Sequence, residues 1–234
     1  MSERELVELE EELGLSRRDL FVKGGVLAAG ATLLGTPAAA AAERAAEAKL
    51  SFAVVTHGAG DVFWKVVKKG VQKAAADLGV SVTYSESFNK PDRQAQLIDT
   101  AVAKKPEGIA VSAPNPSALK DALGRARKAK IPIITLNSGV DQFKALGAIT
   151  HVGQTETIAG QAAGSKLAGA GAKHLLVVIH EQGNAGLEQR FGGAKSTFKR
   201  KVTRLQVKGV SDVAASTNQI RTKLGADKSI DAIL

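Results

Sequence analysis

The chain has 234 residues, of which 44% are hydrophobic and 24% charged, so it is long enough for one large globular domain or two small ones. The absence of cysteine excludes a disulfide framework, thiolate metal sites, a cysteine nucleophile and a lipidated N-terminal cysteine. The formal net charge is +9, and residues from Arg44 onward carry 28 basic and 15 acidic side chains. Such an excess can indicate nucleic acid or an anionic membrane as partner. Here the basic residues recur at helical spacing, as on solvated helix faces, so we expect no nucleic-acid partner.

The first 42 residues have the order of an export signal. The pair Arg17-Arg18 precedes large apolar residues, and an apolar run of 12 residues at 24–35 follows. Twelve helical residues, at about 1.5 Å each, are too few to cross a hydrocarbon layer of about 30 Å. With the small residues that come next, the pattern predicts a twin-arginine signal cleaved near Ala40–Ala42, and export to the periplasm or the extracellular space. An uncleaved amphipathic anchor helix is the alternative.

Beyond this leader, short apolar runs alternate with amphipathic stretches. The apolar runs predict strands at 50–56, 80–84, 108–112, 131–136, 148–152, 174–179, 202–207 and 230–234. The stretches between them predict helices at 61–78, 91–103, 116–129, 155–168, 186–199 and 213–224. Continuously apolar strands separated by helices indicate parallel sheets covered on both faces. Right-handed crossovers then give an α/β fold of doubly wound, flavodoxin-like layers.

A break in this alternation near residues 137–153 divides the chain. A loop there leads to an extra short strand before the next helix. We therefore expect an N-terminal lobe at 43–153 and a C-terminal lobe at 154–234, behind the export signal at 1–42. The second lobe would hold only three strands and three helices, either as a small second sheet or as an incomplete lobe.

Several short segments carry a family resemblance through their order and spacing, although no single one is decisive. They are THGAGDVFW at 56–64, the helical segments 70–79 and 94–101, GIAV at 108–111, IPIITLNSG at 131–139, VGQ at 152–154 with Ala159-Gly160, and HEQGN at 180–184 leading to Arg190. Together they resemble the sugar-binding subunits of ABC importers, in the branch that contains the ribose-binding proteins.

The resemblance implies the type I periplasmic binding protein fold, in which two α/β lobes close on a sugar and the closed form docks on a membrane permease. It implies a sugar or polyol ligand, an ABC transporter permease as partner and no catalytic activity, cofactor or metal. The twin-arginine translocase would be the partner during export. Chains of the family normally continue past a strand such as that at 230–234, so we expect the second lobe to be incomplete.

Binding a neutral sugar requires apolar surfaces for its C–H faces and planar polar groups for its hydroxyls in a water-poor cleft. In open α/β sheets such groups follow the carboxyl ends of strands. On this basis and on the resemblance, nine residues are expected to contact the ligand: His57, Asp61, Phe63, Trp64, Asn137, Ser138, Gln154, Asn184 and Arg190.

The aromatic pair has a structural alternative, which is packing within the lobe. Phe63 and Trp64 are adjacent at the start of a predicted helix, where successive side chains point about 100° apart. Both side chains therefore cannot belong to the core. In the family, the aromatic pair at this position lines the sugar site.

The polar residues also have structural alternatives. Asp61 and Asn184 stand where helix N-caps are expected, and Asn137 stands in a turn-forming Asn-Ser-Gly sequence. Ribose-binding proteins commonly carry an acid–arginine pair at the positions of Asn137 and Ser138, so a different sugar or a weaker grip is implied. Arg190 aligns with a family arginine that reaches the sugar, and a surface salt bridge is the alternative.

The sequence contains no complete phosphate-binding, dinucleotide-binding or metal-binding motif. A phosphate-loop interpretation of residues 189–197 lacks both required glycines, because Gln189 and Ala194 stand in their places. A dinucleotide motif fails because Phe63 takes the place of its third glycine, and the four histidines are too scattered for a metal site. Two other classes stay open: an exported α/β enzyme acting on a small carbohydrate, and a sugar-responsive regulator of the lac repressor type. The regulator would need an N-terminal helix-turn-helix where this chain carries its leader.

Overall fold

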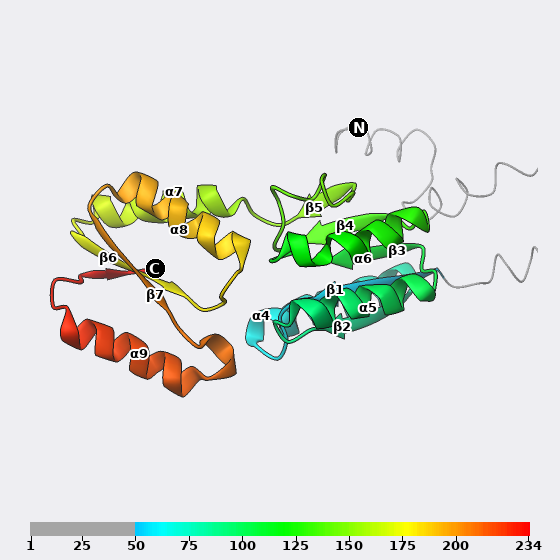
Figure 1. The fold of residues 1–234 in the computed structure, drawn as a ribbon, viewed down its shortest axis with the longest axis horizontal. Coiled ribbons are helices and arrows are strands. Elements are labelled where there is room, and N and C mark those ends of the chain that lie inside the picture. Colours follow the sequence, from blue (N-terminus) through cyan, green and yellow to red (C-terminus); the bar gives the residue numbers. More distant parts are fainter. Residues whose placement is uncertain (1–49) are drawn as a thin grey trace, which may run out of the picture. The chain divides into compact units, whose positions relative to one another are not determined.

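The computed structural model describes residues 50–234 (Figure 1). The predicted export signal at 1–42 lies outside these residues. Within the described part, Leu50–Lys73 and Ser81–Leu234 form one compact unit. No helix in this part is long and apolar enough to cross a membrane.

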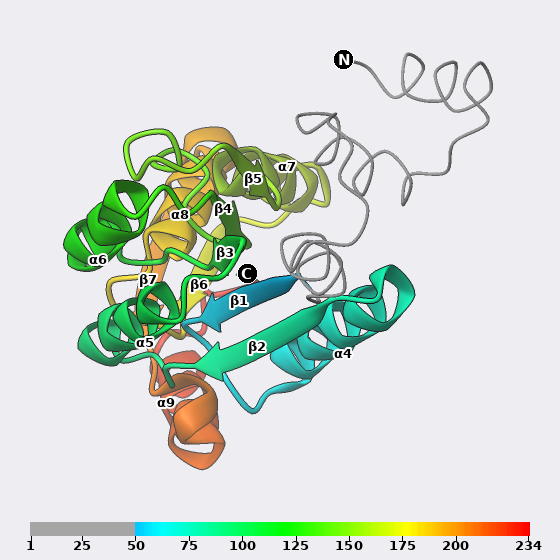
Figure 2. The ribbon, with the colours of Figure 1, turned by 90° about the vertical axis from the view of Figure 1, so that its right-hand side faces the viewer.

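Two parallel sheets form the framework, as the alternating pattern predicted. The first sheet has the strand order β2-β1-β3-β4-β5, which is the flavodoxin-like order. Its strands are β1 (Ser51–Thr56), β2 (Ser81–Glu86), β3 (Gly108–Val111), β4 (Ile133–Leu136) and β5 (Thr150–Val152). Every neighbouring pair is parallel, and Figure 2 shows β1 and β2 side by side with the same direction.

The second sheet has three parallel strands in the order β7-β6-β8. They are β6 (His174–Ile179), β7 (Lys201–Gln206) and β8 (Ala232–Ile233). The helices of the described chain are α4 (Val62–Leu78), α5 (Pro91–Ala103), α6 (Pro116–Lys128), α7 (Glu156–Gly169), α8 (Ala185–Phe198), the 3-10 turn η1 (Gly209–Ser211) and α9 (Val213–Ala226).

The core of the first sheet lies between its strands and the helices α5 and α6. Ile109 and Ile133 point from the strands into this core, and Ile98, Leu119 and Leu123 meet them from the helices. All five are almost fully buried, and burying such a side chain contributes about 1.5–3 kcal/mol. The N-cap of α6 is Asn115, whose side chain accepts a hydrogen bond from the Ala118 backbone N–H. This capping residue and the apolar pattern of the sequence both place the start of the helix at Pro116.

The second sheet is covered by the helix pair α7 and α8, which lie side by side (Figure 1). Phe198 and Ala194 of α8 pack on Leu175, Val177 and Ile179 of β6. No residue of α9 is buried.

Three predicted strands begin two residues later in the structure than in the sequence pattern, and the one predicted at 148–152 begins at Thr150. The strand predicted from Ile131 begins at Ile133, because the Ile131 N–H donates to Ala126 at the end of α6. The strand predicted at 230–234 pairs only over Ala232–Ile233. The segment just before it is fixed by Asp231, whose carboxylate accepts hydrogen bonds from the N–H groups of Lys173 and His174 at the start of β6.

Candidate ligand-binding site

A cavity of about 300 Å³ opens where the strands of both sheets end. Its lining combines aromatic, amide, hydroxyl and charged side chains: His57, Asp61, Phe63, Trp64, Asn137, Ser138, Gln154, Glu156, His180, Glu181, Asn184, Gly186, Leu187 and Arg190. All nine residues expected from the sequence therefore lie on one cavity. Five further residues were not expected, and two of these, Glu156 and Glu181, hold expected ones in place.

His57 follows β1 directly and is fixed on both sides of its ring. Its backbone N–H donates to Ser112 Oγ at 2.8 Å, and its Nδ1 lies 2.8 Å from the same oxygen. Its Nε2 lies 3.3 Å from Glu181 Oε2. All these contacts are satisfied when the Ser112 hydroxyl donates to Nδ1 and the Nε2 proton faces the carboxylate. His57 is buried, so these contacts fix the orientation of its ring.

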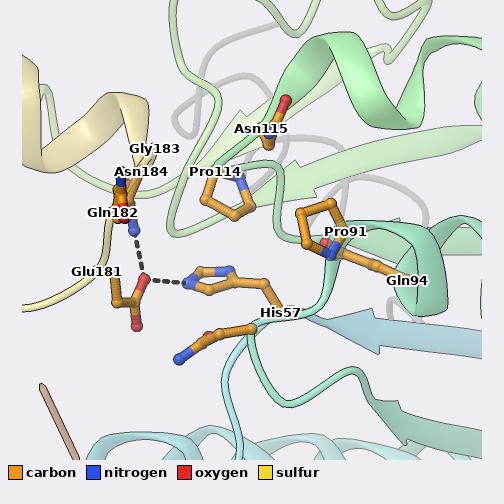
Figure 3. Close-up of a pocket in the computed structure, with 10 residues that line it drawn as sticks. His57, Pro91, Gln94, Pro114, Asn115, Glu181, Gln182, Gly183 and Asn184 are labelled. Carbon is orange, nitrogen blue, oxygen red and sulfur yellow. Dashed lines mark hydrogen bonds and ion pairs between the residues drawn. The ribbon is translucent and has the colours of Figure 1, made fainter. Parts of the chain in front are cut away.

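Glu181 follows β6 and links His57 to Asn184 (Figure 3). Asn184 Nδ2 donates to Glu181 Oε2 at 2.7 Å. Burial works to raise the pKa of the Glu181 carboxyl, but the hydrogen bonds from His57 and Asn184, together with His180, lower it below its usual value. The carboxylate is therefore held ionised at the cavity wall. Figure 3 shows the same three side chains beside a smaller neighbouring pocket that also includes Pro114.

Asn184 also caps α8, which was the structural alternative for this residue. Its Oδ1 accepts from the N–H groups of Gly186 at 3.0 Å and Leu187 at 3.4 Å. The two ends of one amide thus perform two tasks, since Oδ1 caps the helix and Nδ2 holds Glu181.

The aromatic pair divides between core and surface. Asp61 Oδ1 accepts from the Trp64 N–H at 2.9 Å and so caps the first turn of α4. Trp64 is only 3% exposed and makes edge contacts with the rings of His57 at 4.9 Å and Phe63 at 5.0 Å. Its indole covers Gly58 so closely that any side chain there would overlap it. Phe63 is 52% exposed, and its ring lines the cavity.

Asn137 and Ser138 form a tight turn after β4. Asn137 has a left-handed backbone (φ 60°), and its N–H donates to the Val152 carbonyl at 2.9 Å. Ser138 Oγ donates to Asn137 Oδ1 at 2.8 Å. The turn alternative therefore describes this backbone, and the same turn places both side chains on the cavity.

Arg190 reaches the cavity from α8 and pairs with Glu156 at the first position of α7. Its Nε and Nη2 lie 2.6 Å and 2.5 Å from the same oxygen, Glu156 Oε2. Gln154 Nε2 donates to the other oxygen, Oε1, at 3.1 Å. The partner of Arg190 is thus a cavity carboxylate that is 6% exposed, and not a surface residue.

The arrangement supplies what a neutral, hydroxyl-rich molecule requires. Amide, imidazole and guanidinium groups can donate, while carboxylate and hydroxyl oxygens can accept, around an exposed aromatic ring. Among residues 50–234 there is no group of three His, Cys, Asp or Glu that could hold a metal. The fold is thus of the two-sheet α/β class, with a cavity of the size of a small molecule where the strands end.

The family is shown by comparison with known sequences. A family model described as a periplasmic binding protein domain matches residues 52–234. The chain belongs to this family. The D-allose-binding periplasmic protein of Escherichia coli is 30% identical over 199 residues, which cover 81% of this chain and 62% of that protein. A ribose import binding protein of Salmonella typhimurium is 31% identical over 160 residues, covering 67% of this chain and 52% of that protein.

Solved structures agree with this family. A carbohydrate transporter from Acidothermus cellulolyticus, crystallised in complex with myo-inositol, superposes with a TM-score of 0.77 at 42% identity. The match covers 79% of this chain and 64% of that one. A periplasmic sugar-binding protein from Legionella pneumophila gives a TM-score of 0.72 at 26% identity. The chain spans between 52% and 70% of the length of these four relatives.

Proposed function

We propose that this chain is an exported solute-binding protein that captures a neutral sugar or cyclic polyol and delivers it to an ABC transporter permease. The observation that carries the proposal is the convergence of nine separately placed side chains on one cavity. Its volume of about 300 Å³ stands at the lower end of the range for small-molecule sites, about 300–1,000 Å³. A ligand of one sugar ring fits such a space better than an oligosaccharide.

The proposed contacts follow from the chemistry of the lining. The exposed ring of Phe63 would cover a C–H face of the ligand, and Trp64 would support that ring from behind. Asn137 and Arg190 would bind hydroxyl groups from the ends of the two sheets. His57, Asp61, Ser138, Gln154 and Asn184 would complete the set, in part by holding these groups in place.

myo-Inositol is the first ligand to test. The solved relative at 42% identity was crystallised with it, and other relatives are named for D-allose and ribose. Glu181 is held ionised and Asp61 also faces the cavity, whereas the charge of Glu156 is paired with Arg190, so the carboxylates of Glu181 and Asp61 oppose an anionic ligand. A neutral polyol is therefore favoured over a sugar phosphate or a sugar acid.

Export completes the proposal. A leader with Arg17-Arg18 and cleavage near Ala40–Ala42 would direct the chain through the twin-arginine translocase to the periplasm or the extracellular space. Because the chain has no cysteine, it cannot carry a lipid on an N-terminal cysteine. Replacement of Arg17-Arg18 by two lysines should leave the protein in the cytoplasm, and fractionation followed by immunoblotting would show this.

The binding experiment uses the single tryptophan of the chain, Trp64, which forms part of the cavity wall. Its fluorescence should change saturably on titration with myo-inositol, D-allose or D-ribose, and calorimetry should give the same dissociation constant. myo-Inositol-1-phosphate serves as the anionic control and should bind weakly. If the folded protein binds no neutral sugar or polyol, the proposed function is wrong.

A further inference from the structure

The Glu156–Arg190 pair has an asymmetric geometry. A guanidinium carries five N–H donors in a rigid plane. In this pair the Nε–H donates to Glu156 Oε2 at 2.6 Å, and Nη2 lies 2.5 Å from the same oxygen. At least three N–H donors of Arg190 then have no protein partner among the residues that the structure describes. Because Arg190 lines the cavity and its side chain is 36% exposed, these three donors are available to a ligand.

Both carboxylate oxygens of Glu156 are engaged by protein donors. Its side chain is 8% exposed, one of its oxygens takes both contacts from Arg190, and the other accepts from Gln154 Nε2. Its Cγ is also close enough to Gly186 that a side chain at that glycine would press on it. The carboxylate is thus fixed by its neighbours and occupied by protein donors before a ligand binds.

The backbones that carry the pair are also fixed. A methyl group at Gly160 of α7 would overlap the backbone carbonyl oxygen of Arg190 on α8. Thr197 Oγ1 of α8 donates to the Gln161 carbonyl of α7 at 2.8 Å. Helices in such close contact cannot slide without breaking these interactions, so the distance between Glu156 and Arg190 is set by the fold.

We infer that Glu156 is a positioning residue that sets the hydroxyl selectivity of the site through Arg190. It holds one edge of the guanidinium and thereby directs the other edge into the cavity at one angle. A planar donor pair held at one angle distinguishes the orientation of a hydroxyl group, whereas a free arginine would adapt to several orientations. The inference rests on the proposed function, because selectivity is defined only for a protein that binds a polyol.

The test is a double-mutant cycle with Glu156→Gln and Arg190→Met, measured by calorimetry with two probes. myo-Inositol and scyllo-inositol differ in the orientation of one hydroxyl group, so the ratio of their dissociation constants measures selectivity. Each single variant should bind the preferred inositol at least about tenfold more weakly, which corresponds to about 1.4 kcal/mol. The double variant should lose no more than Arg190→Met alone, since Glu156 acts through Arg190. Glu156→Gln should also bring the ratio close to the value for Arg190→Met.

Glu188→Gln is the matched control. Glu188 lies on the same helix as Arg190, α8, but outside the cavity lining. It pairs with Arg204 of β7 at 2.5 Å. Loss of this exposed pair should leave both dissociation constants unchanged. A conservative variant, Glu156→Asp, keeps the charge and should retain part of the selectivity.

The outcomes separate the two proposals. If the wild-type protein discriminates between the inositols but Glu156→Gln weakens both equally, Glu156 is only structural and the inference is overturned. Additive losses in the double variant would overturn it as well. If the wild-type protein binds no neutral sugar or polyol, the proposed function fails first and the inference fails with it.

Discussion

The close packing of α7 on α8 makes one substitution unusually informative. Gly193 of α8 lies against α7, and a methyl group there would overlap the backbone carbonyl oxygen of Thr157. The same methyl group would lie 3.0 Å from the Gln161 nitrogen. Both obstacles are backbone atoms of a helix, which cannot rotate away as a side chain could. Gly193→Ala should therefore force the two helices apart.

The neighbouring glycine gives the opposite expectation. Gly192 has nothing within 4 Å of the position that its methyl group would take. Alanine stabilises a helix interior relative to glycine by about 0.5–1 kcal/mol, so Gly192→Ala should stabilise the protein by that amount. At Gly193 the same gain is outweighed by overpacking, which typically costs about 1–3 kcal/mol. Two adjacent Gly→Ala changes should thus have opposite signs.

Thermal unfolding of the ligand-free protein by circular dichroism measures the difference. For a chain of this size about 1 kcal/mol corresponds to about 2–4 °C. Gly192→Ala should raise the melting temperature by roughly 1–4 °C, and Gly193→Ala should lower it by roughly 2–8 °C. Gly193→Ala should also weaken ligand binding, because the same interface holds Arg190 beside Glu156. Equal melting temperatures for the two variants would refute the packing argument.

Two further predictions concern the cavity wall. Phe63→Ala should weaken binding of the best ligand by about 0.5–1.5 kcal/mol with little change in melting temperature, because its ring is half exposed. Trp64→Ala should instead destabilise the protein by about 3–5 kcal/mol, since the indole is buried, and a similar melting temperature for both variants would contradict this. Because the pKa of Glu181 is lowered in the folded state, its stabilising contribution is complete above about pH 4.5 and is lost as the pH falls through the lower folded-state pKa. Glu181→Gln should therefore melt with less acid dependence below pH 4.5 than the wild type, and identical acid profiles would exclude this role.

Much of the fold could be predicted because the strands carry their signal locally. The run at 174–179 and the helix at 91–103 have the predicted bounds, since unbroken apolar stretches and a helix-starting proline need no tertiary information. The strand expected at 230–234 shortened because hydrogen bonding to β6 decides where a strand ends. Strand β6 is distant in sequence from this strand, and its first N–H group, that of His174, donates to the Asp231 carboxylate instead of to a strand carbonyl.

The candidate site could be predicted where its residues directly follow the carboxyl ends of parallel strands. His57 follows β1 and Asn137 follows β4, so both were expected at the edge where the cavity lies. Glu156 and Glu181 were missed although each is within three residues of an expected one. A carboxylate becomes part of the site through the residue it contacts, and the partners Arg190 and His57 are far away in sequence. The only local signal was an acidic residue next to an expected polar one.

The choice between a structural and a ligand-binding role is less sharp than the sequence implied. Asp61 caps α4 with Oδ1, and Asn184 caps α8 with Oδ1, yet both side chains line the cavity. A side chain that is already fixed by a helix end has lost its rotamer freedom during folding, so a ligand need not immobilise it again. Capping thus favours tight binding wherever a second polar atom faces the ligand. The same reasoning applies to Glu156, whose contacts fix Arg190 in advance, and it explains why structural bonds and candidate ligand contacts coincide in this cavity.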